Sequence, residues 1–287
     1  MITEFLQAPK GCSKMPTIAV CSWSLKPCSW ADLIDKIGLC GLSEIQLALD
    51  PIASGRWNID KTAEQSKDSR VRICSGMMET VGEDYSSLES IKRTGGIRPD
   101  EHWSANQSRA RNCAAVADHL GLDLVTLHAG FIPCEKTLEH QTVIDRIKII
   151  ADIFGGYEIQ IGLETGQERA ESLLDLLGRP GLSHVGINFD PANMILYGMG
   201  DPSSALDMLK GRIVQVHMKD AVSADIHDEW GIETPVGQGE VDWDRFFEIL
   251  GTLSGDISVV IEREGGDQRV KDIIEACKIA KAYGYER

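Results

Sequence analysis

Four reactive side chains, three carboxylates and one imidazole, each lie at the end of a short apolar run. Glu164 ends "EIQIGLE", Asp190 ends "HVGINFD", His217 lies in "IVQVHMK" and Glu262 ends "ISVVIE". Three carboxylates crowded together repel one another and raise each other's pKa unless a cation neutralises them. A divalent metal ion removes that repulsion, and the imidazole completes a mixed oxygen and nitrogen ligand set. The four residues are therefore candidate metal ligands.

The ligand types also narrow the choice of metal. Structural zinc sites are typically rich in sulfur ligands, whereas three carboxylates with one histidine suit Mn²⁺, Mg²⁺ or Co²⁺. We favour Mn²⁺ among these ions, and Zn²⁺ is also compatible with the set. Each residue alone has an ordinary structural explanation. A carboxylate that ends a strand often caps a helix, and a strand histidine is often a hydrogen-bonded core residue. Four such residues at four strand ends favour the metal site.

Side-chain alternation places the four candidates on equivalent faces of their strands, because successive residues of a strand point to opposite sides. In "IVQVHMK" one face carries Val214, Val216 and Met218, and the other carries Gln215, His217 and Lys219. The same alternation puts Glu164, Asp190 and Glu262 opposite the apolar residues of their own strands. We expect the apolar faces to pack against helices and the polar faces to line a barrel.

Strand and helix patterns alternate along the chain from residue 17. Strands are expected at 17–23, 43–49, 70–77, 122–128, 157–164, 184–190, 212–218 and 257–262. Helices are expected at 29–39, 58–68, 104–120, 136–154, 168–178, 202–210, 242–252 and 267–283. Eight such repeats predict an α/β fold, a single (β/α)₈ TIM barrel, whose chemistry lies at the carboxyl ends of the strands. We expect residues 1–16 to be an N-terminal extension and 17–287 to be the catalytic domain.

Composition limits the partners. The 287 residues carry a net charge of −15, from 29 basic and 44 acidic side chains, which argues against nucleic acid or an anionic membrane as a partner. The eight cysteines contain no C-x-x-C pair, which favours buried free thiols in a reducing compartment. No signal-peptide core or membrane-length apolar run is present. We therefore expect a cytoplasmic protein.

Several motifs give the chain a resemblance to the sugar phosphate isomerase/epimerase superfamily, which has a xylose isomerase-like TIM barrel and includes ketose 3-epimerases, hydroxypyruvate isomerase and inosose dehydratase. The matching stretches are "VTLHAG" (125–130), "GLETG" (162–166), "NFDPAN" (188–193), "VHMKD" (216–220), "PVGQGEVDW" (235–243) and "VIERE" (260–264). The resemblance covers residues 17 to 283. It implies metal ligation by Glu164, Asp190, His217 and Glu262.

The resemblance also implies a mechanism. Glu164 and Glu262 would act as an acid/base pair around a cis-enediolate that the metal stabilises. The partner would be a small carbohydrate, and barrels of this kind occur as monomers, dimers and tetramers, so a homo-oligomer is compatible with it. Candidate substrate contacts are His128, at the end of the fourth strand, together with Asn193 and Lys219. Glu264 shares the phase of Glu262, and Glu262 is preferred because it ends the apolar run.

The leading hypothesis is a divalent-metal-dependent isomerase or epimerase of a sugar, keto-sugar or related polyol. A dehydratase or lyase of the inosose dehydratase type, which uses the same enolate, is the alternative. An apurinic endonuclease is a distant alternative, because the third strand ends without a histidine and Asp225 and His227 do not match the endonuclease spacing. A non-catalytic binding protein that keeps the barrel is a further alternative. Trp230 lies in the long seventh loop, where it could line a sugar site, and Trp103 lies beside the third loop.

Overall fold

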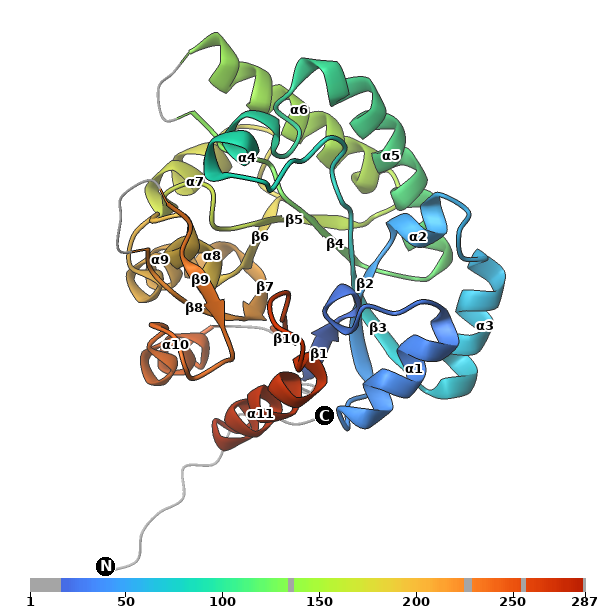
Figure 1. Cartoon of the computed structure of the whole chain (residues 1–287). Helices are drawn as coiled ribbons and strands as arrows, with labels where there is room; N and C mark the ends of the chain where they lie inside the picture. The colour runs from blue at the N-terminus through green and yellow to red at the C-terminus, as the bar shows by residue number, and fades with distance from the viewer. Residues whose placement is uncertain (1–16, 134–136, 225–228, 254–256, 286–287) are drawn as a thin grey trace, which may run out of the picture.

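The computed structural model describes residues 17–133, 137–224, 229–253 and 257–285, so the expected N-terminal extension, Asp225 and His227 lie outside the described residues. Eight parallel strands close into a barrel (Figure 1), in the order β1-β10-β7-β6-β5-β4-β3-β2. The barrel strands are β1 (Ile18–Cys21), β2 (Glu44–Ala48), β3 (Arg72–Met77), β4 (Leu124–Leu127), β5 (Gln160–Glu164), β6 (Gly186–Phe189), β7 (Ile213–Met218) and β10 (Ser258–Ile261). All eight expected strands are confirmed.

Helices surround the barrel (Figure 1). Those that the sequence predicts are α1 (Trp30–Leu39), α3 (Ile59–Ser69), α5 (Asp100–His119), α6 (Leu138–Gly155), α7 (Ala170–Leu177), α9 (Pro202–Leu209), α10 (Trp243–Leu250) and α11 (Arg269–Ala282). The unpredicted elements are η1 (Ser22–Leu25), α2 (Asp50–Ala53), α4 (Leu88–Thr94), α8 (Pro191–Leu196), η2 (Lys210–Arg212) and the antiparallel pair β8 (Asp220–Val222) and β9 (Ile232–Thr234). The unpredicted helices have at most seven residues, about two turns or fewer, and the two unpredicted strands have three residues each, so neither shows a full periodic pattern.

The main hydrophobic core lies between the barrel and its helices. The outward residues Ile161, Leu163, Phe189 and Val216 are buried there, as the alternation predicts. A separate small cluster of Ala19, Cys21 and Val260 packs within the barrel. The polar and small faces of the strands therefore line the barrel interior. Among the described residues, no helix is long and apolar enough to cross a membrane.

One residue departs from the expected alternation. In the pairing of β6 with β7, Ile187 lies opposite Ile213 and Asn188 opposite Gln215, so a bulge leaves Val214 unpaired. A bulge breaks the two-residue period. A Cβ atom added to Gly186 would lie 2.3 Å from Val214 Cγ1, so Val214 packs against the small residues of the neighbouring strands. We expected Val214 to point outward, and that prediction is wrong. Val216 and His217, which follow the bulge, lie on the sides that the alternation predicts.

Candidate metal centre and active-site pocket

The structure brings the four candidate ligands together. Glu164, Asp190, His217 and Glu262 come from four neighbouring strands, and each offers one ligand atom within 4.8 Å of the others. His217 Nδ1 lies 3.5 Å from Glu164 Oε1, 3.6 Å from Asp190 Oδ2 and 3.3 Å from Glu262 Oε2. None of the four residues is more than 4% exposed. We call this set the four-residue cluster.

Two atoms of the four-residue cluster are buried without a hydrogen-bond partner among the described residues, namely Asp190 Oδ2 and His217 Nδ1. A buried polar atom without a partner is costly unless a ligand or ion satisfies it. The other oxygen, Asp190 Oδ1, accepts a hydrogen bond from the backbone N–H of Asn193 at 2.9 Å and so caps the N-terminus of α8. Asp190 therefore serves as a helix cap through one oxygen and leaves the other facing the cluster. Three carboxylates and one imidazole nitrogen are donors that fit a divalent cation.

The charged groups of the four-residue cluster shift one another's pKa values. Burial opposes a charged imidazole, but Cys21 and the neighbouring carboxylates of Glu164 and Glu262 outweigh it and hold the pKa of His217 well above its usual range. Burial alone would raise the pKa of Glu262, but Lys219 and His217 hold it well below its usual range. Burial raises the pKa of Asp190. The site thus concentrates negative charge that a cation would neutralise.

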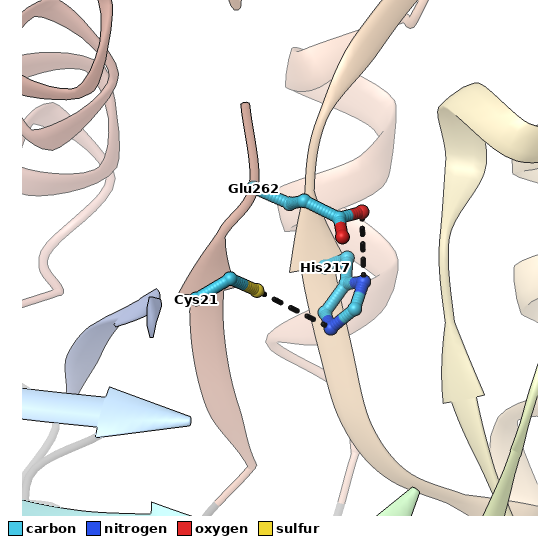
Figure 2. Close-up of side chains that lie close together, drawn as sticks. All are labelled: Cys21, His217 and Glu262. Carbon is cyan, nitrogen blue, oxygen red and sulfur yellow. Dashed lines mark hydrogen bonds and ion pairs between the residues drawn. The ribbon is translucent and has the colours of Figure 1, made fainter. Parts of the chain in front are cut away.

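The two nitrogens of His217 face different groups (Figure 2). The Glu262 carboxylate lies at Nδ1, and the Cys21 sulfur lies 3.8 Å from Nε2 on the other side of the ring. Burial raises the pKa of the Cys21 thiol far above its usual range. Cys21, His217 and Glu262 form a second group whose donor atoms lie within 4.8 Å of one another. The Cys21 sulfur lies on the Nε2 side of the imidazole, and the carboxylates gather at Nδ1.

Asn193 and Lys219 connect the two carboxylates expected to act as acid and base. Asn193 Nδ2 donates to Glu164 Oε1 at 3.0 Å, and Lys219 Nζ donates to Glu262 Oε2 at 2.9 Å. Lys219 also donates to Asn193 Oδ1 at 3.3 Å and to Glu264 Oε2 at 2.7 Å. Glu264 thus pairs with Lys219 and is not part of the four-residue cluster. These contacts fix the positions of both carboxylates.

Two supporting features were missed by sequence reasoning. Trp23, on η1, donates from Nε1 to Glu262 Oε1 at 2.6 Å, and no local pattern predicts a contact across 239 residues. Gly166 has φ of +136°, and a Cβ atom there would lie 2.3 Å from Asn193 Cβ. Glycine therefore lets the loop after Glu164 approach α8 closely enough for the Asn193–Glu164 hydrogen bond.

A cavity of about 550 Å³ opens over the four-residue cluster. His128, which lines it, has Nε2 3.5 Å from Glu164 Oε1. An aromatic wall is formed by Tyr197 and Trp230, whose ring centroids lie 5.0 Å apart. The acidic and basic side chains that line the cavity are Asp50, Arg56, Glu79, Glu83, Glu164, Lys219, Glu233, Glu262 and Glu264. Trp103 packs instead against Arg146, with the guanidinium carbon 5.0 Å from its ring centroid.

Asp220, the first residue of β8, anchors the loop between β9 and α10. Its carboxylate is fully buried and accepts hydrogen bonds from the backbone amides of Ala221, Gly237, Gly239 and Val241 and from the Trp243 indole. A Cβ atom on Gly239 would lie 2.1 Å from Asp220 Oδ1, so glycine allows this close approach. The motifs "VHMKD" and "PVGQGEVDW" therefore meet at this carboxylate.

Glu168, in the loop after β5, is a buried acid outside the four-residue cluster. Its Oε1 atom has no hydrogen-bond partner among the described residues. Burial, with a smaller contribution from Glu164, raises the pKa of Glu168 to about 8. The side chain is therefore largely protonated at neutral pH.

Comparison with known proteins identifies the family of this chain and gives the same barrel fold. The family model described as "Xylose isomerase-like TIM barrel" matches residues 58–283, so the chain belongs to that family. A xylose isomerase domain protein from Planctomyces limnophilus is 24% identical, with a TM-score of 0.83 and coverage of 94% of this chain and 97% of that one. No sufficiently similar sequence was found among curated proteins.

Two further solved structures share the fold. A D-tagatose 3-epimerase-like protein is 20% identical, with a TM-score of 0.70 over 93% of this chain and 96% of that one. The IOLI protein, solved with a zinc atom, is 17% identical, with a TM-score of 0.67 over 93% of this chain and 96% of that one. At these identities the likeness shows the barrel fold.

Proposed function

We propose that this member of the xylose isomerase-like TIM barrel family is a divalent-metal-dependent isomerase or epimerase of a sugar, keto-sugar or related polyol. The observation that carries the proposal is a pair of buried atoms without a hydrogen-bond partner among the described residues, Asp190 Oδ2 and His217 Nδ1, which lie beside the carboxylates of Glu164 and Glu262. Among the relatives, an epimerase-like protein and a zinc-bound protein share the fold and support this assignment.

Glu164, Asp190, His217 and Glu262 would hold the metal ion. The oxygen-rich donor set favours Mn²⁺, and Mg²⁺, Co²⁺ and Zn²⁺ are also compatible with it. When bound, the cation would supply a Lewis acid that polarises the substrate carbonyl and stabilises the negative charge of the enediolate. Burial of all four side chains excludes water and strengthens their interaction with a cation.

Glu164 and Glu262 are the proposed acid/base pair. One carboxylate would take a proton from the carbon next to the carbonyl, and the other would return a proton. Return to the neighbouring carbon gives isomerisation, and return to the opposite face of the same carbon gives epimerisation. Hydrogen bonds from Asn193 to Glu164 and from Lys219 and Trp23 to Glu262 support fixed positions for this transfer.

The cavity is suited to a small carbohydrate. Its volume of about 550 Å³ falls in the usual range for small-molecule sites. We propose that His128, Asn193 and Lys219 contact substrate oxygens, because each carries a polar side chain within hydrogen-bonding or ion-pair range of the two catalytic carboxylates. Tyr197 and Trp230 would pack against the less polar face of the sugar ring.

The test is exchange of solvent deuterium into a panel of ketoses and inososes by the Mn²⁺-reconstituted protein. Glu164→Gln and Glu262→Gln are expected to abolish exchange while the protein stays folded. Glu264→Gln is the matched control, because Glu264 shares Lys219 but lies outside the four-residue cluster. Exchange that persists at the wild-type rate in both glutamine variants would contradict the two-carboxylate mechanism.

Product mass separates the alternatives. An isomerase or epimerase conserves the mass of the substrate, whereas a dehydratase of the inosose dehydratase type releases water. A product lighter by one water would assign the dehydratase reaction to the same site. Mn²⁺ binding without turnover of any carbohydrate in the panel would favour a binding protein, and cleavage of an abasic duplex would favour the endonuclease reading.

A further inference from the structure

A network of buried polar side chains lies inside the barrel beside the four-residue cluster. The members of this buried polar network, none more than 1% exposed, are Gln46, Ser75, Thr126, Asn188 and Gln215. Ser75 donates to Gln215 at 2.6 Å, and Gln215 donates to Asn188 Oδ1 at 3.2 Å. Burying an amide is costly unless its polar atoms are paired. The polar residues of these strands thus form a connected set with the site.

Gln46, at the centre of β2, is the member that contacts His217. Its Oε1 atom lies 2.8 Å from His217 Nε2, and its Nε2 atom donates to Thr126 Oγ1 at 2.8 Å. In this arrangement the amide nitrogen of Gln46 faces Thr126 and its oxygen faces the imidazole. The oxygen can only accept, so the hydrogen of this contact belongs to His217 Nε2.

The position of that hydrogen determines the role of the other ring nitrogen. A histidine that binds a metal ion is neutral and carries one N–H and one lone pair, so a hydrogen on Nε2 leaves the lone pair on Nδ1. Nδ1 is the unpartnered atom that faces the three carboxylates. The hydrogen bond to Gln46 therefore selects the tautomer that can bind a metal ion.

Asn188 offers the competing contact. Its Nδ2 atom lies 3.0 Å from His217 Nε2 and, as a donor, would favour the opposite tautomer. The same Nδ2 atom donates to Glu164 Oε2 at 3.2 Å, and Gln215 engages the Asn188 oxygen. Loss of the Gln46 acceptor would leave Asn188 as the remaining amide at Nε2. The metal-binding tautomer therefore depends on Gln46.

We infer that Gln46 is a positioning residue of the metal site, which fixes His217 with its Nδ1 lone pair facing the four-residue cluster. This inference rests on the metal site of the proposed function. Partners of this kind, which bind the far nitrogen of a ligating histidine, typically change metal affinity 10- to 100-fold when removed. The substitution Gln46→Leu should weaken metal binding by roughly that factor.

The first experiment is titration of the full-length, metal-free protein with Mn²⁺, with free Mn²⁺ measured by electron paramagnetic resonance. Gln46→Leu should raise the dissociation constant about 10- to 100-fold, and Gln46→Glu, which keeps an acceptor at Nε2, should restore it to within about threefold of the wild-type value. Ser75→Ala is the matched control, because it removes a buried hydrogen bond of the same network that does not touch His217. It should leave the constant within about threefold of wild type.

A dissociation constant for Gln46→Leu within about threefold of wild type, or an equal loss in Ser75→Ala, would overturn the inference. Failure of the wild type to bind Mn²⁺ would overturn both this inference and the proposed function. Normal Mn²⁺ binding without turnover would affect the proposed function alone.

A second measurement needs no variant and so survives misfolding of Gln46→Leu. Nitrogen-15 NMR of the wild-type protein loaded with Zn²⁺ reports which nitrogen of His217 carries hydrogen. A protonated Nε2 with a metal-bound Nδ1 is expected. A hydrogen on Nδ1, or Zn²⁺ at Nε2, would refute the role of Gln46.

Discussion

The carboxylate of Asp220 offers a quantitative test of how the site loop is held. Its Oδ1 atom accepts hydrogen bonds at 2.9 and 3.2 Å, and its Oδ2 atom accepts three at 2.8, 3.1 and 3.0 Å. In Asp220→Asn one oxygen becomes an NH₂ group, which faces two or three N–H donors and pairs with none of them. Hydrogen bonds to a charged group contribute about 1.5–3 kcal/mol each, and neighbouring losses are not additive, so we expect roughly 3–6 kcal/mol of destabilisation.

Thermal unfolding followed by circular dichroism measures this loss. For a chain of this size, 1 kcal/mol lowers Tm by about 2–4 °C, so Asp220→Asn should melt on the order of 10 °C lower. Asp242→Asn is the control on the same loop, because Asp242 caps α10 and asparagine caps a helix about as well as aspartate. A Tm for Asp220→Asn within about 2 °C of wild type would refute the role given to the buried carboxylate.

Three further predictions concern charge and the cavity wall. Lys219→Met leaves Glu262 and Glu264 without their shared cation, so the metal-free protein should lose about 3 kcal/mol of stability in chemical denaturation and Mn²⁺ should recover part of it; an unchanged midpoint would contradict the pairing. The pKa of Glu168 is about 8 in the folded protein and about 4.3 in the unfolded chain. The free energy of unfolding therefore falls as pH rises from about 4.3 towards 8, because only the unfolded chain releases this proton over most of that range. Glu168→Gln should therefore flatten the fall in Tm between pH 5 and 8, and an identical pH profile would argue against a buried protonated acid. Trp230→Ala should raise the KM for the carbohydrate about tenfold with unchanged Mn²⁺ affinity, and an unaltered KM would exclude the aromatic wall from substrate binding.

The eight strands could be predicted because each is a short apolar run with regular alternation. The same alternation explains why the sequence alone assigns His217 and Glu262 to one side of the barrel. It failed at Val214, because a bulge adds a residue without leaving a signal in the sequence. The alternation predicted the place of Asp190 in the four-residue cluster but not its second role as the N-cap of α8. That helix has six residues, too few to be predicted from the sequence.

Long-range polar contacts could not be predicted. Trp23 reaches Glu262 and Gln46 reaches His217 across more than 170 residues. In the sequence, Gln46 is marked only as a polar residue between Ile45 and Leu47. Its contact with His217 forms when the barrel closes, so the sequence does not predict it. Asp220 lay in a recognised motif, and its function as a loop anchor depends on five donors that only the folded chain assembles.

The most direct test of the metal site is elemental analysis of the purified protein after reconstitution with Mn²⁺, compared with His217→Ala. His128→Ala is the control, because His128 lines the cavity outside the four-residue cluster. We predict about one divalent metal ion per chain in the wild type and in His128→Ala, and loss of that ion in His217→Ala. Absence of metal from the reconstituted wild type, or equal metal content in His217→Ala, would contradict the assignment of these four residues as a metal centre.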